Sequence, residues 1–405
     1  MSDGRPIRTV FLFATGLLIA RHAVWGATPI EVIVPLADRL VEEQVPSGDL
    51  KGTWPGEEAY TGTIVAGLVR AYQIACDDRY RQAAEAGAEF FVGAAEGNFY
   101  GDEAYALTLL SEISGGQADD NRWFPLVQAF YANVKDLAVG GTSAYLSGFD
   151  GAERSVAVFY LAHHTVSAYY VDAEDKQMWR QALLDFLREV DDSSAAFPVT
   201  SLGVATWALA ATGPLDDSLM DPSSEGAICW RGKRLSDLPD VLMDHQVGAD
   251  GVLPGSFYWR FDHSDGASGG PVSGFTEDLI FASLGLLGAA RAADPNQRLD
   301  SAIVAARTAL LDSLSWVDTA YQHLWLLGGN DRLYTGEALQ AVAEFVPAGD
   351  LNLDGKVNAV DFSAWAGYWR ETGCLDYCRC GRADFNRDRE VNYQDLRILA
   401  TRWME

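Results

Sequence analysis

The sequence predicts an all-α protein, and three observations support that fold class. Apolar residues recur at helical spacing from Pro29 to Val346. No run of alternating polar and apolar residues indicates a convincing strand. Two kinds of helical segment alternate, one apolar on every side and one with a polar stripe. A helix that is apolar all round is buried, whereas a polar stripe faces water. We therefore expect buried and outer helices to alternate along the chain.

The expected helices come in six pairs. The buried member of each pair is expected at Tyr60–Ala75, Tyr100–Ile113, Ser155–Val171, Ser201–Thr212, Phe275–Ala292 and Val317–Leu327. The outer member follows at Arg79–Val92, Arg122–Lys135, Lys176–Val190, Ser236–His245, Arg298–Ser313 and Gly336–Phe345. The pairs start at irregular intervals, whereas an open solenoid repeats at a fixed period. The pattern resembles the (α/α)6 toroid of six-hairpin glycosidases, polysaccharide lyases and terpenoid cyclases. That resemblance implies an inner ring of helices inside an outer ring over residues 28–346.

The C-terminal segment repeats an oxygen-rich loop. The first copy runs from Gly349 to Asp361, and the second begins 34 residues after it. Side-chain oxygens fall at the spacing of a calcium-binding EF-hand loop, with one backbone carbonyl at the seventh position. The expected calcium ligands are Asp350, Asn352, Asp354, Lys356, Asn358 and Asp361, then Asp384, Asn386, Asp388, Glu390, Asn392 and Asp395. Arg389 stands where the first loop has Gly355, and this turn favours positive φ. We therefore expect two calcium ions, the second bound more weakly.

Each loop is followed by a helix but not preceded by one. Pro347 and Gly349 oppose a helix before the first loop. Apolar residues recur at helical spacing after each loop, at Phe362, Trp365 and Trp369 and again at Leu396, Leu399 and Trp403. Two such units in register resemble a type I dockerin, over about residues 349–405. The resemblance implies calcium-dependent folding and a cohesin-like or cell-envelope protein as partner. The loop positions that contact the partner would be Ala359, Val360, Tyr393 and Gln394, which depart from the Ser-Thr pair of the best-known dockerins.

The N-terminus and the charge limit where the protein acts. Arg5 and Arg8 precede the apolar run from Val10 to Ala20, which is too short to span a bilayer. Residues 1–27 are therefore expected to be a signal peptide, with an N-terminal anchor as the alternative, and the protein is expected to be secreted or at the cell surface. The net charge is −27. Such a charge argues against nucleic acid or an anionic membrane as partner.

The five cysteines fall into two groups. Cys374, Cys378 and Cys380 lie between the two loops, where export permits a disulfide. Cys76 and Cys229 lie in apolar surroundings and are expected to be buried. The spacer Val346–Gly349 is too short to be a flexible tether, so we expect the C-terminal module to pack close to the helical domain.

The segments that lead into the apolar helices are rich in aromatic and acidic residues. Sugars have apolar faces and hydroxyl edges, which suit aromatic platforms and carboxylates. Glycoside hydrolysis generally uses two carboxylates, one protonated and one ionised. The expected catalytic acids are Asp262, Asp265, Glu57, Asp102 and Glu277. The expected substrate-binding residues are Trp54, Tyr60, Tyr100, Tyr105, Tyr258, Trp259, Arg260 and His263.

Each of these acids has a simpler structural explanation. Glu57, Asp102 and Glu277 are at expected helix starts, where a carboxylate stabilises the helix without any catalysis, and the others can be solvated surface carboxylates. The sequence has no Gly-x-Ser-x-Gly elbow, phosphate loop, dinucleotide fingerprint or His-Glu-x-x-His motif. The dockerin resemblance implies polysaccharide degradation, and we expect a glycoside hydrolase. A uronate lyase on the same fold is one alternative, because Arg260 and His263 could serve a proton abstraction. A non-catalytic glycan-binding or structural protein is the other.

Overall fold

The computed structural model describes residues 27–115, 121–135, 154–251, 253–264, 277–293, 297–315, 331–374, 378–386 and 388–403. Over these residues the regular elements are α-helices and short 3-10 turns. The β-structure in the described part of the chain is limited to isolated bridges such as Leu219 with Arg234. The expected all-α fold class is confirmed. The expected signal peptide and the expected helix Val317–Leu327 fall outside the described residues.

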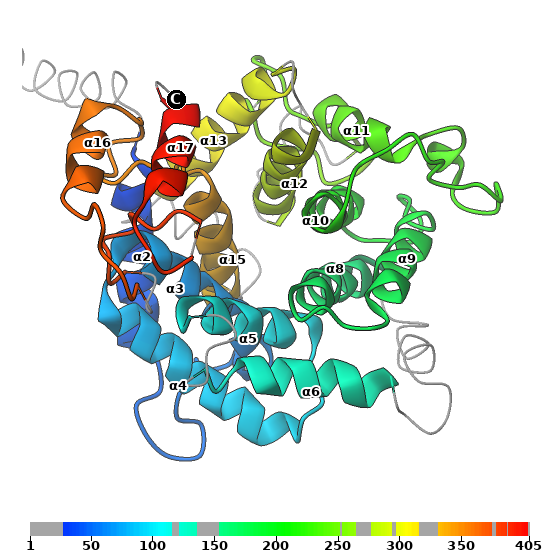
Figure 1. Ribbon diagram of the computed structural model, residues 1–405. Helices are drawn as coiled ribbons and strands as arrows, with labels where there is room; N and C mark the ends of the chain where they lie inside the picture. The colour runs from blue at the N-terminus through cyan, green and yellow to red at the C-terminus, as the bar shows by residue number, and fades with distance from the viewer. Residues whose placement is uncertain are drawn as a thin grey trace, which may run out of the picture.

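Six helices form a closed circuit of contacts (Figure 1). They are α3 (Thr61–Ala75), α5 (Gly101–Ile113), α8 (Arg154–Tyr170), α10 (Pro198–Thr212), α12 (Glu277–Ala293) and α15 (Asp331–Glu344). Each helix contacts the next, and α15 returns to α3. Nearly every residue of α3 and α10 is buried, as expected for a helix surrounded by others. We call these six helices the inner ring.

Helices of a second set pack against the inner ring from outside. They are α2 (Pro29–Glu43), α4 (Asp78–Ala95), α6 (Phe124–Lys135), α9 (Lys176–Leu187), α11 (Leu238–Asp244) and α13 (Asp300–Ser315). Helix α2, for example, contacts α3 and α15, and α9 contacts α8 and α10. Most of these outer helices contact two inner helices, whereas α6 packs mainly on α5, and one core cluster of buried residues extends between the two sets.

One helix lies on the other side of the fold from its expected place. The segment Gly336–Phe345 was expected to be an outer helix, but α15 belongs to the inner ring. Its polar residues misled that prediction, because a polar stripe normally faces water. Glu337 and Gln340 are instead buried, with 1% and 4% of their surface exposed. Helix α2 occupies the outer position beside α15. The expected helices began only at Tyr60, so they did not include α2.

Small residues let the inner helices approach closely. A Cβ atom added to Gly67 of α3 would lie 2.3 Å from the carbonyl oxygen of Gly336 on α15. A Cβ atom on Gly101 of α5 would lie 2.1 Å from the carbonyl oxygen of Tyr160 on α8. No side chain fits at such distances, so glycine at these positions sets the spacing of the ring.

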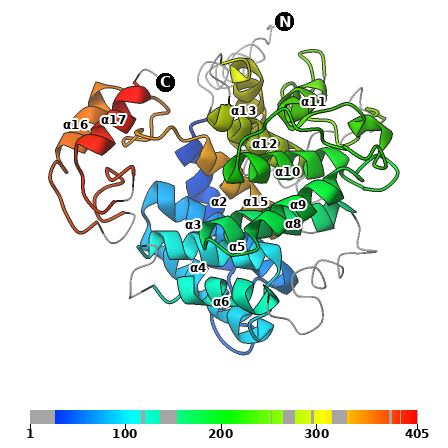
Figure 2. The same ribbon diagram turned by 45° about the vertical axis from the view of Figure 1, so that its right-hand side comes forward.

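The C-terminal module, residues 349–403, has its own small core. Helices α16 (Ala359–Ala366) and α17 (Tyr393–Thr401) each follow one of the repeated loops. Trp365 and Leu399 belong to one buried cluster that also contains Val357 and Val391. Figure 2 shows the module at one side of the helical domain.

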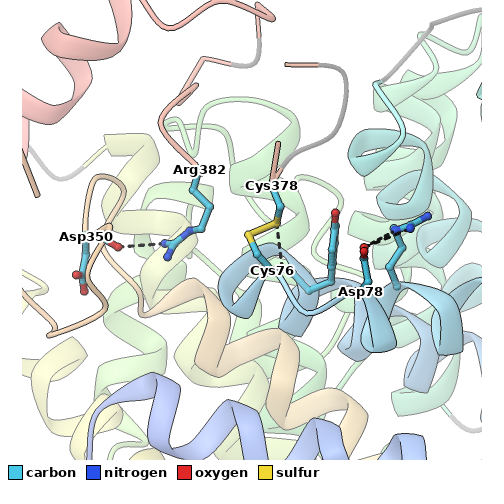
Figure 3. The surroundings of a disulfide bond; sticks show 7 residues. Cys76, Asp78, Asp350, Cys378 and Arg382 are labelled. Carbon is cyan, nitrogen blue, oxygen red and sulfur yellow. Dashed lines mark hydrogen bonds and ion pairs between the residues drawn. A yellow bond between two sulfur atoms is a disulfide. The ribbon is translucent and has the colours of Figure 1, made fainter. Parts of the chain in front are cut away.

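Covalent and polar contacts hold the module against the helical domain (Figure 3). Cys378 forms a disulfide with Cys76, which caps the C-terminal end of α3. Arg389 of the module donates a 2.9 Å hydrogen bond to the Gly115 carbonyl after α5. The expected close packing of the module is confirmed by these contacts.

The remaining cysteines correct one expectation. Cys374 and Cys380 form the second disulfide, within the segment where one was expected. Cys76 is bonded rather than simply buried, and Cys229 is an exposed thiol. The apolar sequence around Cys229 was therefore a poor guide to its burial. No helix in the described part of the chain combines the length and apolarity needed to cross a bilayer.

Candidate functional site

Four carboxylates from different segments meet at the N-terminal end of the inner ring. Glu57 lies in the turn before α3, Asp102 in the first turn of α5, Glu277 at the first position of α12, and Glu337 in the second turn of α15. Glu337 is buried, and burial raises its pKa well above the usual range. The negative charges of Glu277, Asp102 and Glu57 raise it further. We call these four residues the acid cluster.

Two members of the acid cluster are held by the start of a neighbouring inner helix. Glu57 accepts hydrogen bonds from the backbone N–H groups of Arg332, at 3.3 Å, and Leu333, at 2.6 Å, in α15. Asp102 accepts from both the backbone N–H and the hydroxyl of Thr63 in α3, each at 3.1 Å. N–H groups in the first turn of a helix have no partner within that helix, so the two carboxylates satisfy them. In doing so they connect neighbouring helices of the inner ring.

Other polar atoms of the cluster are left without partners. Asp102 Oδ1 and Glu337 Oε2 are buried and accept no hydrogen bond from the described residues. Desolvation raises the pKa of Asp102 to about 6, although its hydrogen bonds to Thr63 oppose the shift. A buried carboxyl with an unpartnered oxygen is costly for folding and is characteristic of functional sites.

Four tyrosines and a further glutamate surround the acid cluster. Tyr60, Tyr100, Tyr160 and Tyr334 are all at least partly exposed, and Tyr100 and Tyr160 lie with ring centroids 5.6 Å apart. Burial raises the pKa of Glu103 to about 8, and the charge of Asp102 adds to the shift. Burial also raises the pKa of Tyr334, and the negative charge of Glu277 raises it further. The group therefore has aromatic faces beside carboxyls of very different acidity.

Two residues expected to bind substrate are buried in the core instead. Trp54 is fully buried and donates from Nε1 to the Leu40 carbonyl at 2.7 Å. Tyr105 is 3% exposed, and its hydroxyl accepts a 2.9 Å hydrogen bond from Arg70. Neither side chain offers a surface to a ligand. Aromatic residues beside helix starts can serve packing as well as binding, and the sequence pattern does not separate the two uses.

The second expected group, residues 256–264, forms a separate packed loop. Trp259 stacks on Phe197, and its carbonyl accepts the Val199 N–H at the start of α10. Tyr258 stacks on His263 at 4.1 Å. Asp265 lies outside the described residues.

The charged residues of this loop are tied to local partners. Asp262 is exposed, and hydrogen bonds with Ser264 lower its pKa. Arg260 donates to the Asp192 carbonyl, and His263 shares a 2.8 Å hydrogen bond with His245. In the described part of the chain the Asp262 carboxylate has local partners, the Ser264 N–H and the Arg260 guanidinium, rather than members of the acid cluster.

Sequence reasoning missed part of the site. Glu337 and Tyr334 were overlooked because α15 was read as an outer helix. Tyr160 lies in the middle of an apolar helix with no flanking signal. The adjacent residues His163 and His164 are buried in the core. His163 packs inside the ring and His164 faces the outer helices, and burial lowers their pKa values to about 4 and about 3.

The first repeated loop is folded around two buried carboxylates. Asp361 accepts from the N–H groups of Leu351, Asn352 and Asn358. Asp350 accepts from the N–H groups of Asp354 and Gly355. Burial, with the charges of Asp361 and Asp354, raises the pKa of Asp350. Carboxylates that repel one another in a folded loop fit a divalent cation, which would relieve that repulsion.

The second loop repeats this geometry. Asp395 accepts from the N–H groups of Phe385, Asn386 and Asn392. Carboxylate oxygens of Asp384, Asp388 and Asp395 all lie within 4.8 Å of one another. Arg389 has a φ of 74°, close to the 84° of Gly355 at the same loop position. The oxygen-only set again suits calcium, and Lys356 and Glu390 occupy the position that supplies a backbone carbonyl.

Comparison with known families settles the nature of this module. Residues 348–402 match the model of the dockerin type I domain. Type I dockerin domains bind calcium, and a dockerin implies a cohesin partner. Proteins that carry a dockerin typically act outside the cell or at its surface. No curated protein and no solved structure matches the chain.

Proposed function

We propose that this protein is an exported, calcium-binding enzyme of polysaccharide degradation, and that it is a glycoside hydrolase. The observation that supports the activity is the acid cluster, in which buried Glu337 has a raised pKa beside three other acids. Glycosidases need one carboxyl protonated and another ionised near neutral pH. The dockerin supports the context, since it indicates a polysaccharide-degrading assembly.

The domain organisation supports the same proposal. The closed circuit of inner helices with outer helices around it favours an (α/α)6 toroid over residues 28–346. In that fold family the ligand site lies where the chain enters the inner helices, which is where the acid cluster lies. A signal peptide over residues 1–27 would deliver the protein to the compartment in which its disulfides form.

The geometry assigns different roles to the acids. Glu337 is the proposed general acid, because burial and neighbouring charges keep it protonated. Glu277 is the proposed ionised partner, because it is half-exposed at the start of α12, where the helix dipole favours negative charge. Asp102 and Glu57 hold the ring in register, and their charges maintain the raised pKa of Glu337.

The tyrosines supply the proposed sugar-binding surface. Tyr60, Tyr100, Tyr160 and Tyr334 offer apolar ring faces, and their hydroxyl groups can bond sugar hydroxyls. A lyase would instead need a cation beside the substrate carboxylate. Among the described residues at this end, Arg332 is a cation that already has acidic partners: its guanidinium pairs with Glu43 at 2.6 Å and lies 3.9 Å from Glu57.

The proposal is tested by incubating the calcium-loaded protein with neutral and uronic-acid polysaccharides. We expect new reducing ends without unsaturated products. Glu337→Gln should lower the rate by about 100-fold or more, because removal of a positioned general acid costs that much. Glu42→Gln, at an exposed site on α2, is the matched control and should keep full activity.

Two results would contradict the hydrolase assignment. Unsaturated products would indicate a lyase. If no substrate gave a product but the protein still bound polysaccharide in a pull-down, the protein would be a glycan-binding protein that uses its dockerin only for attachment.

The partner surface proposed for the dockerin includes both helices. Val360, Phe362, Trp369, Tyr393 and Trp403 are exposed although they are large and apolar. Exposed apolar side chains that cluster on one module mark an interaction surface, and we propose that a cohesin or a cell-envelope protein covers it.

A further inference from the structure

A cavity of about 740 Å³ lies between the helical domain and the dockerin. From the helical domain it is lined by the last turns of α3, α12 and α15 and by α13. From the dockerin it is lined by the first calcium loop and the segments around Arg382 and Arg402. The last turns of the inner helices form its floor, so it lies at the opposite end of the ring from the acid cluster. Its size is that of small-molecule sites.

The charge of this cavity is opposite to that of the chain. The whole sequence has 57 acidic and 30 basic residues. The lining has five arginines and two acids, which are Arg70, Arg291, Arg307, Arg382, Arg402, Asp300 and Glu344. Like charges are costly to gather unless a counter-charge joins them, so the composition calls for an explanation.

Two of these arginines are explained by the fold itself. Arg70 and Arg291 both pair with Glu344, and the Arg70–Glu344 distance is 3.2 Å. Arg291 also lies in the last turn of α12, where the helix dipole favours positive charge. Glu344 is therefore engaged with these two arginines.

Arg307 is not explained in the same way. It lies in the middle of α13, away from any helix end, and its guanidinium approaches Gly355 of the dockerin. Its Nε atom is buried and donates no hydrogen bond within the described part of the chain. Asp350 attracts it, but the Asp350 carboxylate is committed to the N–H groups of its own loop. A buried guanidinium donor calls for an acceptor, and an oxyanion ligand would supply one.

Arg382 brings a second guanidinium to the cavity from the dockerin side. It donates to the Asp350 carbonyl at 3.2 Å, which orients it beside the first calcium loop (Figure 3). Arginine presents paired donors that match carboxylate, sulfate and phosphate oxygens.

We propose that this cavity is a binding site for an oxyanion, in which Arg307 and Arg382 contact a carboxylate or sulfate group. The ligand is either a free inorganic oxyanion or an acidic sugar unit. The proposal does not depend on the hydrolase activity, because the cavity and the acid cluster lie at opposite ends of the ring. The ligand would bridge the helical domain and the dockerin.

Calorimetric titration of the calcium-saturated full-length protein tests the site. The probes are sodium sulfate, a uronate trisaccharide and a neutral trisaccharide of the same linkage, all at constant ionic strength. We expect sulfate to bind and the neutral sugar not to bind at this site. Uronate binding at least tenfold tighter than sulfate identifies an acidic sugar, whereas equal or weaker binding identifies an inorganic oxyanion.

Variants locate the site. Arg307→Gln and Arg382→Gln should each weaken anion binding at least tenfold, and Arg307→Lys should retain part of it. Arg231→Gln, at an exposed position, should bind as the unchanged protein does. Melting curves check that each variant is folded, and Arg307→Lys serves if Arg307→Gln is not. Absence of binding by both anions, or unchanged binding in the folded Arg307 variant, would mean that these arginines only hold the two parts together.

Discussion

Glu337 shows how a single buried residue can weaken a fold. Its carboxyl is buried, one oxygen has no partner among the described residues, and three acids repel its charge. Such a group is favourable only while it is protonated. Natural selection for stability alone would replace it with an apolar residue, so its presence fits a site where a protonated carboxyl is needed.

The stability of the helical domain should depend on Glu337 in a predictable direction. Below the ordinary glutamate pKa of 4.5 the group is protonated in both states and contributes its full stability. As the pH rises, the unfolded chain loses the proton first, so stability falls until the pH passes the raised folded pKa. Glu337→Gln should therefore raise the melting temperature at pH 8 and change it little at pH 4.

Thermal melts across this range, at constant calcium concentration, measure the difference between the variant and the unchanged protein. Glu42→Gln should show no such trend. A difference that stays the same from pH 4 to pH 8 would mean that Glu337 is not held protonated.

At the scale of elements, the two dockerin loops differ at one position that matters. Gly355 adopts positive φ at no steric cost, whereas Arg389 adopts nearly the same conformation with a side chain. The strained residue also makes a stabilising contact, because the Arg389 side chain donates a hydrogen bond to the Gly115 carbonyl of the helical domain. At this position the first loop has glycine, whereas the second loop has an arginine that also docks the module.

Replacement of Arg389 should separate these two roles. Arg389→Gly removes strain of about 1–2 kcal/mol and should tighten calcium binding at the second loop by about 5- to 30-fold. Arg389→Lys keeps the strain and should leave that affinity unchanged. Calcium titration followed by calorimetry gives both values, and an unchanged affinity in Arg389→Gly would refute the strain argument.

Much of this element structure could be predicted from the sequence, because periodicity reports which faces are apolar. The spans of α3, α5, α8 and α10 differ from expectation by only a few residues. The place of α15 could not be predicted, since periodicity shows that residues such as Glu337 are polar but not that they are buried. Glu57, Asp102 and Glu277 were found because helix starts are visible in sequence. Their meeting with Glu337 depends on ring closure, which local patterns do not encode.

At the scale of the whole molecule, the disulfide between Cys76 and Cys378 joins positions 302 residues apart. Sequence spacing gave no indication of this pair, because the partner of Cys378 lies in the helical domain rather than among its neighbours. The bridge limits how far the dockerin can move from the end of α3. The acid cluster and the dockerin surface therefore keep a fixed relation when a cohesin partner binds.

Removal of this bridge should loosen the dockerin. The double substitution Cys76→Ser and Cys378→Ser should lower stability by about 2–5 kcal/mol, because it frees a long loop in the unfolded chain. Small-angle scattering in calcium should show a larger radius of gyration and a wider range of shapes. The pair Cys374→Ser and Cys380→Ser is the control, since it opens a short loop within the dockerin. Unchanged scattering in the first variant would show that non-covalent contacts alone fix the module.

The same bridge has a consequence for damage by proteases. The spacer Val346–Gly349 is the direct chain connection between the helical domain and the dockerin. A protease that cuts this spacer would not release the helical domain from the dockerin, because Cys378 would still hold the severed dockerin to Cys76. Detachment would require two events, cleavage and reduction. An extracellular assembly built from such subunits would keep its parts through nicks that would dismantle one joined by peptide linkers alone.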